Sequence, residues 1–106
     1  MKKIFAFILI ANLLLATNEL SKAYESIKNP LVIIDKYLED GSSQGSIIST
    51  LTGFMQSYIE GCEKAPKNKL CQEYENNITH QIQKSGGKDK FLDSYGDEIM
   101  RLILGE

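Results

Sequence analysis

The fold is decided between residues 46 and 82, which read SIISTLTGFMQSYIEGCEKAPKNKLCQEYENNITHQI. Two amphipathic segments in this stretch flank a polar loop that is closed by the only two cysteines of the chain, Cys62 and Cys71. In both segments apolar side chains recur every three to four residues, which is the spacing of a helix that buries one face. Gly61 and Pro66 break the pattern between them. We therefore predict two helices that fold back on each other.

The rest of the chain predicts one helix before this hairpin and one after it. Asn29 and Pro30 are typical of a helix start, and Gly41 is typical of a helix end. Gly96 is expected to kink or split the last helix. Because no segment alternates in the manner of a strand, the expected fold class is all-α, a small bundle of about four short helices with a disulfide-closed central hairpin. The expected helices cover residues 30–40, 43 or 46 to 62, 67–84 and 89–104.

The amino terminus has the pattern of a secretory signal. Two lysines precede an apolar run over residues 4–15, and small residues at Ser21 and Ala23 fit a signal peptidase site. A membrane anchor is the alternative, but the run is shorter than the roughly 20 residues that a spanning helix needs. The expected organisation is a cleaved signal peptide over residues 1–23 and a single helical domain over residues 24–106, located in the periplasm or secreted.

The charge of the mature chain argues against two classes of partner. Cleavage would remove three lysines and one glutamate from 12 basic and 14 acidic residues, which leaves 9 and 13 and a formal charge of −4. An acidic chain without a basic stripe does not favour nucleic acid or an anionic membrane surface. We therefore expect no nucleic-acid binding and no stable membrane insertion after cleavage.

Export also determines how the two cysteines are interpreted. In a small exported protein, Cys62 and Cys71 are expected to form one disulfide. By chain entropy such a loop stabilises the fold by about 2.5 to 3 kcal/mol. The alternative, a metal or redox pair, lacks the C-x-x-C spacing and lacks further Cys or His ligands.

The sequence offers little material for catalysis. His80 is the single histidine, and its neighbours on a helix surface, at positions 76, 77, 83 and 84, are not carboxylates. Acidic residues occur next to one another, as in Asp97 and Glu98, and adjacent residues on a helix point in different directions. No phosphate-binding loop, nucleophile elbow or metalloprotease motif is present. We expect no enzyme, no cofactor and no metal site, unless carboxylates from different helices converge.

One short motif carries a resemblance. The sequence Ser57-Tyr58-Ile59-Glu60-Gly61 resembles the Gly-Tyr-Ile-x-Gly helix of small periplasmic immunity proteins, with Ser57 at the place of the first glycine. The exported, helical, one-disulfide design is also similar to that of enterobacterial acid-stress chaperones, which space their cysteines farther apart. These resemblances imply a protein that acts by binding another protein.

The expected function is therefore a non-enzymatic exported protein that binds a protein partner, as an inhibitor, an immunity protein or a holdase. The alternatives are a homodimerising structural module and a signal-anchored, membrane-associated protein. The partner is expected on the hydroxyl-rich side of the second helix and the loop that follows it, where contacts leave no buried charge unpaired. The residues expected to contact the partner are Ser49, Thr52, Gln56, Glu60, Lys64 and Lys67.

Overall fold

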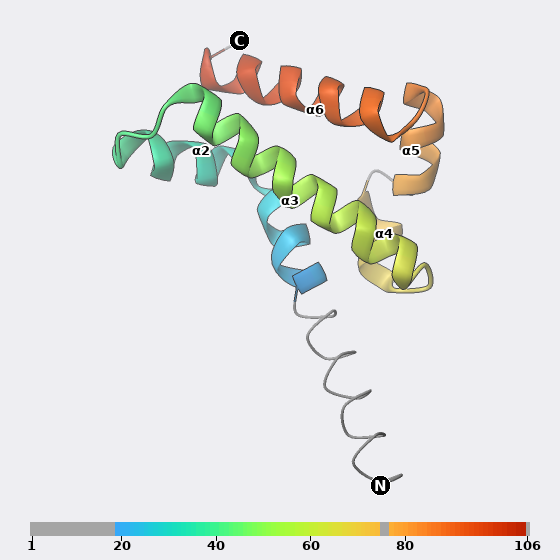
Figure 1. Ribbon diagram of the computed structural model, residues 1–106. Helices are drawn as coiled ribbons and strands as arrows, with labels where there is room; N and C mark the ends of the chain where they lie inside the picture. The colour runs from blue at the N-terminus through green and yellow to red at the C-terminus, as the bar shows by residue number, and fades with distance from the viewer. Residues whose placement is uncertain (1–18, 75–76, 106) are drawn as a thin grey trace, which may run out of the picture.

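The computed structural model describes residues 19–74 and 77–105, and all regular structure in these ranges is helical, which confirms the all-α prediction. Figure 1 shows α3 running through the middle of the molecule, with α6 along one side and α4 and α5 near its C-terminal end. A further helix covers residues 19–28. The labelled helices are α2 (Pro30–Glu39), α3 (Gln44–Lys64), α4 (Lys69–Glu73), α5 (Ile78–Ser85) and α6 (Lys88–Ile103).

The core is built around the apolar side of α3. Leu51, Met55 and Tyr58 are fully buried, with none of their surface exposed. Each large side chain removed from water in this way stabilises the fold by about 1.5–3 kcal/mol, so one face of α3 organises the other helices. The remaining buried residues are Leu20, Ala23, Ile27, Ile34, Ile47, Ile59, Cys62, Cys71, Ile78, Phe91, Tyr95 and Ile99.

The starts of α2 and α3 agree with the sequence. Pro30 occupies the first turn of α2, although the side chain of Asn29 makes no capping hydrogen bond. The Ser43 hydroxyl accepts a hydrogen bond from the Ser46 backbone N–H at 3.1 Å, which satisfies one of the free donors at the start of α3. The turn between the two helices contains Gly41 with φ +83°, a conformation that side chains disfavour.

The helix predicted over residues 67–84 is wrong as a single element, because α4 ends at Glu73 and α5 begins at Ile78. Tyr74 has an extended backbone, with ψ 105°. The Asn77 side chain then accepts a hydrogen bond from the Thr79 N–H at 2.9 Å and caps α5. An asparagine side chain that bonds to a nearby backbone N–H competes with continuation of the preceding helix. A new helix therefore starts after Asn77, inside the segment that was expected to be one polar helix.

The interruption expected at Gly96 is also absent, because α6 is one helix from Lys88 to Ile103. Gly96 faces α3, where a Cβ atom would meet Ile48 at 3.6 Å and the Thr52 hydroxyl at 3.8 Å. Packing against α3 therefore offsets the weak helix propensity of this glycine.

The helix over residues 19–28 belongs to the same core as α3. Leu20 and Ala23, which the predicted signal peptide includes, are 3% and 2% exposed. Leu20 lies so close to Gly61 that a Cβ atom there would approach its Cδ1 to 2.9 Å. The remainder of the predicted signal peptide, residues 1–18, lies outside the described residues, and cleavage stays a prediction. None of the helices in the described ranges is long and apolar enough to cross a bilayer.

Two interactions connect the C-terminal part of α3 to α4. Cys62 and Cys71 lie at disulfide distance, with their Cα atoms 5.5 Å apart, as the predicted bridge requires. The Tyr58 hydroxyl donates a hydrogen bond to the Leu70 carbonyl. Burial raises the pKa of Tyr58 to about 12, so this hydroxyl stays protonated and able to donate at neutral pH. The central hairpin therefore has a cysteine pair at disulfide distance and a part-buried hydrogen bond between the same two helices.

Candidate functional site

The hydroxyl-rich side of α3 lies along a groove that α6 completes. This α3–α6 groove has a volume of about 550 Å³. Its wall from α3 is uncharged and combines one isoleucine with small and amide residues, whereas its wall from α6 carries two carboxylates. The lining residues are Ile48, Ser49, Thr52, Gly53 and Gln56 from α3, and Leu92, Asp93, Gly96, Asp97 and Met100 from α6.

The groove is open because two glycines line it. A Cβ atom added at Gly53 would meet no atom within 4 Å, so the space above it is free. Gly96 on α6 likewise places no side chain in the space between the helices. Glycine at such positions allows the backbone of another chain to approach closely.

A hydroxyl in the groove has no partner in the described part of the chain. The Thr52 Oγ1 atom is buried and makes no hydrogen bond there. Thr50, two residues earlier, instead donates its hydroxyl to the Ser46 carbonyl at 2.9 Å. Because a buried polar atom without a partner costs about 1–3 kcal/mol, Thr52 is a group that a bound molecule would satisfy.

The α6 wall gives the groove a negative charge. Asp93 and Asp97 are exposed and lie one helical turn apart. Neither carboxylate forms an ion pair within residues 19–74 and 77–105, where the ion pair present is that of Lys88 with Glu63. Two unpaired carboxylates beside a neutral wall favour a positively charged partner.

The structure divides the six residues predicted to contact a partner. Ser49, Thr52 and Gln56 lie in the α3–α6 groove. Glu60 and Lys64 line a separate depression of about 90 Å³ beside Leu20 of the first helix. Gln56 and Glu60 are nevertheless neighbours, since the Gln56 amide donates to a Glu60 carboxylate oxygen at 3.3 Å. The sixth residue, Lys67, is exposed in the loop between α3 and α4.

Sequence reasoning did not identify the α6 wall. The sequence presents Asp97 only as the neighbour of Glu98, and Gly96 only as a kink or break in the last helix, whereas both line the groove. The spacing of Asp93 and Asp97 by four residues, with a glycine between them, was the available signal. This spacing indicates a groove wall only once α6 is known to lie against α3.

The described residues hold no group of three or more His, Cys, Asp or Glu side chains that could bind a metal ion. His80 is exposed on α5 and does not line the groove. The groove offers hydrogen-bonding groups, negative charge and apolar surface from Ile48, Leu92 and Met100.

The motif that resembles the immunity proteins lies within α3 and mostly serves the core. Tyr58 and Ile59 are buried, and Gly61 lies against Leu20. The comparisons with known proteins add no family to this resemblance. No protein-family model matches the chain, and no curated protein or solved structure was found to match it.

Proposed function

We propose that this protein is a non-enzymatic, exported binding protein whose α3–α6 groove receives a basic segment of a partner protein. The observation that carries the proposal is that one groove combines an uncharged wall with two carboxylates that have no ion-pair partner in the described part of the chain. An inhibitor, an immunity protein or a holdase would all act in this manner.

The shape of the groove supports a segment of polypeptide as the occupant. Gly53 leaves room for a close backbone approach, and the unpartnered Thr52 hydroxyl supplies a hydrogen bond at the same level. Ile48, Leu92 and Met100 offer apolar surface to the side chains of such a segment. Aliphatic contacts at the centre with charges at the rim are the usual arrangement of protein interfaces.

The charges support a basic occupant. Asp93 and Asp97 are spaced by one helical turn and match lysine or arginine side chains on a partner segment. Rim charges of this kind accelerate association more than they tighten binding, so the interaction should weaken as the salt concentration rises.

The test is affinity capture from the cell envelope with the oxidised protein and two groove variants. Gly53→Gln fills the open space, and the double variant Asp93→Asn with Asp97→Asn removes the charge. We expect both to reduce the amount of the captured partner by about tenfold at physiological salt, a change equivalent to about 1.4 kcal/mol.

The matched control is the double variant Asp35→Asn with Glu39→Gln. These two carboxylates are also exposed and one turn apart, but they lie on α2, outside the groove. The control should capture as much partner as the wild type. A partner that is retained equally by all variants, as quantified by mass spectrometry, would place binding elsewhere or remove the proposal.

A homodimer is the second candidate, because apolar surface is exposed on α2. Leu31 and Val32 are 54% and 67% exposed, and they border a hollow of about 400 Å³ beside Pro30 and Leu102. A second copy of the chain could cover this surface about a twofold axis. Light scattering at micromolar concentration distinguishes the two candidates, since the mass of a single chain excludes the dimer.

A further inference from the structure

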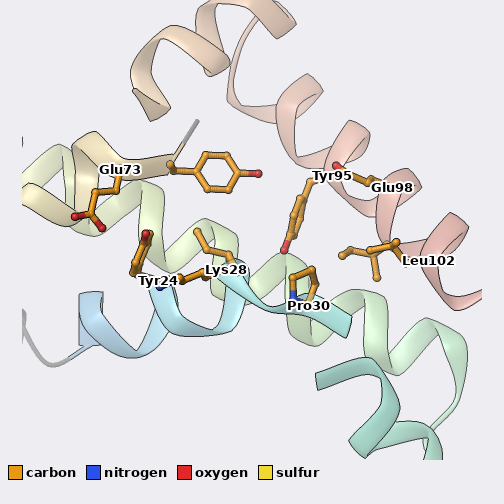
Figure 2. Close-up of a pocket in the computed structure, with 10 residues that line it drawn as sticks. Tyr24, Lys28, Pro30, Glu73, Tyr95, Glu98 and Leu102 are labelled. Atoms are coloured by element: carbon orange, nitrogen blue, oxygen red, sulfur yellow. The ribbon is translucent and has the colours of Figure 1, made fainter. Parts of the chain in front are cut away.

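A second cavity lies on a different face of α6 from the groove. It has a volume of about 310 Å³ and lies between the helix over residues 19–28, the end of α4 and α6. Three tyrosine side chains, Tyr24, Tyr74 and Tyr95, line this tyrosine pocket together with apolar side chains (Figure 2). The other lining residues are Ile27, Lys28, Pro30, Glu73, Glu98, Ile99 and Leu102.

The Tyr95 hydroxyl is a buried group without a partner. The side chain is 5% exposed, and its hydroxyl makes no hydrogen bond within the described part of the chain. Figure 2 shows the ring extending from α6 across the pocket towards Pro30. Burial, and then the charge of Glu98, raises the pKa of Tyr95 to about 12, so the hydroxyl is neutral at physiological pH. A molecule in the pocket would satisfy this hydroxyl, which residues 19–74 and 77–105 leave unpaired.

One end of the tyrosine pocket already holds an ammonium group. The Lys28 Nζ atom lies 5.8 Å from the centre of the Tyr24 ring, in a cation–π arrangement. The pKa of Tyr24 is raised by burial and by its hydrogen bond to the Glu73 carboxylate. At this end, therefore, a lysine on an aliphatic stem lies beside an aromatic ring and a carboxylate.

The other end has the same kind of groups but no cation. Figure 2 shows Glu73 and Glu98 at opposite ends of the pocket, with Glu98 beside the part of Tyr95 that joins α6, whereas the Tyr95 hydroxyl points towards Pro30. Glu98 forms no ion pair in residues 19–74 and 77–105. Between the two ends the pocket is lined by Ile27, Ile99 and Leu102.

We propose that the tyrosine pocket binds a primary ammonium group carried on an aliphatic stem. The ammonium donates a hydrogen bond to the Tyr95 hydroxyl oxygen and has Glu98 as its counter-ion. The stem packs against Ile99 and Leu102. A carboxylate ligand is disfavoured because Glu98 would repel it, and an uncharged alcohol lacks the attraction to the carboxylate and to the ring faces.

The first experiment titrates the ¹⁵N-labelled, oxidised protein with n-hexylamine and follows the backbone amides of Tyr95 and Ile99 by NMR. A ligand of this size is expected to bind with a Kd of about 1–10 mM. Hexanol, which has the same stem, should bind about fivefold more weakly, and hexanoate should not bind. Equal binding of hexanol and hexylamine, or tighter binding of hexanoate, would overturn the proposal. No saturable shift with any probe would also overturn it and assign the Tyr95 hydroxyl to ordered water.

Two variants test the residues that recognise the ammonium. Tyr95→Phe keeps the ring and removes the hydroxyl, and should weaken hexylamine binding by about three- to tenfold. Glu98→Gln should weaken it by about three- to fivefold, as expected for an exposed charge pair. The control Glu39→Gln makes the same chemical change on α2, away from the pocket, and should have no effect. Unchanged affinity in both pocket variants contradicts the proposal.

Lys28 provides the sharpest test, because its ammonium occupies the other end of the pocket. In the wild type we expect 1,6-diaminohexane to bind no better than hexylamine. In Lys28→Met the Tyr24 and Glu73 end is vacated, and the diamine should bind about fivefold more tightly than to the wild type. If Lys28→Met instead weakens both amines, the charge argument is wrong.

The same chemistry is carried by a free amine and by the lysine side chain of a protein. Nα-acetyl-lysine methylamide, titrated in the same way, distinguishes them. A lower Kd for the blocked lysine assigns the pocket to a lysine of a partner chain, and a lower Kd for hexylamine assigns it to a free amine. Both results require binding that depends on Tyr95 and Glu98.

Discussion

The two sides of α3 differ in the kind of residue they carry and in what surrounds them. On one side Leu51, Met55 and Tyr58 are large and fully buried. On the other side Thr52 and Gly53 are small, and they leave a groove of about 550 Å³ against α6. One helix therefore defines the core with one face and keeps the opposite face open.

The difference suggests that stability and binding are separable in this protein. Substitutions on the buried face remove contacts in a close-packed interior, where lost volume cannot be refilled. Substitutions on the groove face change a surface that no part of the described chain fills. The following predictions test this separation, beginning with the largest expected effect.

Leu51→Ala should be the most destabilising of the changes considered. Leu51 is fully buried in the centre of α3, and truncating such a side chain costs about 3–5 kcal/mol, most of the stability expected for so small a domain. Urea unfolding followed by circular dichroism measures the loss. Ser49→Ala, on the exposed side of the same helix, should change the free energy of unfolding by less than about 0.5 kcal/mol. Equal effects of the two variants would mean that the two faces do not differ as described.

The double variant Cys62→Ser with Cys71→Ser should have the next largest effect. Cys62 ends the buried stripe of α3, and the bridge to α4 is worth about 2.5–3 kcal/mol by chain entropy. We expect the melting temperature to fall by about 10 °C or more. A thiol assay of the native protein is the companion measurement. Two reactive thiols, or a variant that melts within a degree or two of the wild type, would show that packing alone holds this end of the buried face.

Gly53→Ala should have the smallest effect and the opposite sign. A Cβ atom at this position meets nothing within 4 Å, and alanine favours a helix interior over glycine by about 0.5–1 kcal/mol. Thermal unfolding should therefore show a slightly more stable protein. A loss of stability instead would indicate that the groove face is under a packing constraint that the open space does not reveal.

The buried side of α3 could be predicted from the sequence because helical periodicity reports directly on burial. Leu51, Met55 and Tyr58 belong to the apolar residues that recur every three to four positions in the first amphipathic segment, and all three are fully buried. The disulfide distance between Cys62 and Cys71 was likewise expected, since two cysteines allow one pairing.

The groove could not be predicted because it depends on how two distant helices pack. Ser49, Thr52 and Gln56 were identified from their chemistry, but Asp93 and Asp97 reach the groove only through the register of α6 on α3. Periodicity within one helix carries no information about that register.

Two local features were missed for different reasons. Asn77 caps the start of α5 and lies in a run of polar residues. Such a run also fits the exposed surface of one continuous helix, so the sequence does not distinguish a capping asparagine from a surface asparagine. The burial of Leu20 depends on contact with Gly61, forty-one positions later in the chain, so no local pattern reports it. The predicted cleavage after Ala23, which rests on the small residues Ser21 and Ala23, stays a prediction.

The hydrogen bond between α3 and α4 also bears on how the predicted disulfide would form. The Tyr58 hydroxyl holds Leu70 in place, next to Cys71, independently of the sulfur chemistry. Two thiols that folding brings together react at a high effective concentration, so one oxidation step is enough. Because the chain has two cysteines, no other intramolecular disulfide pairing can compete. The predicted bridge would therefore need a thiol oxidant to form, but no disulfide isomerase to correct its pairing.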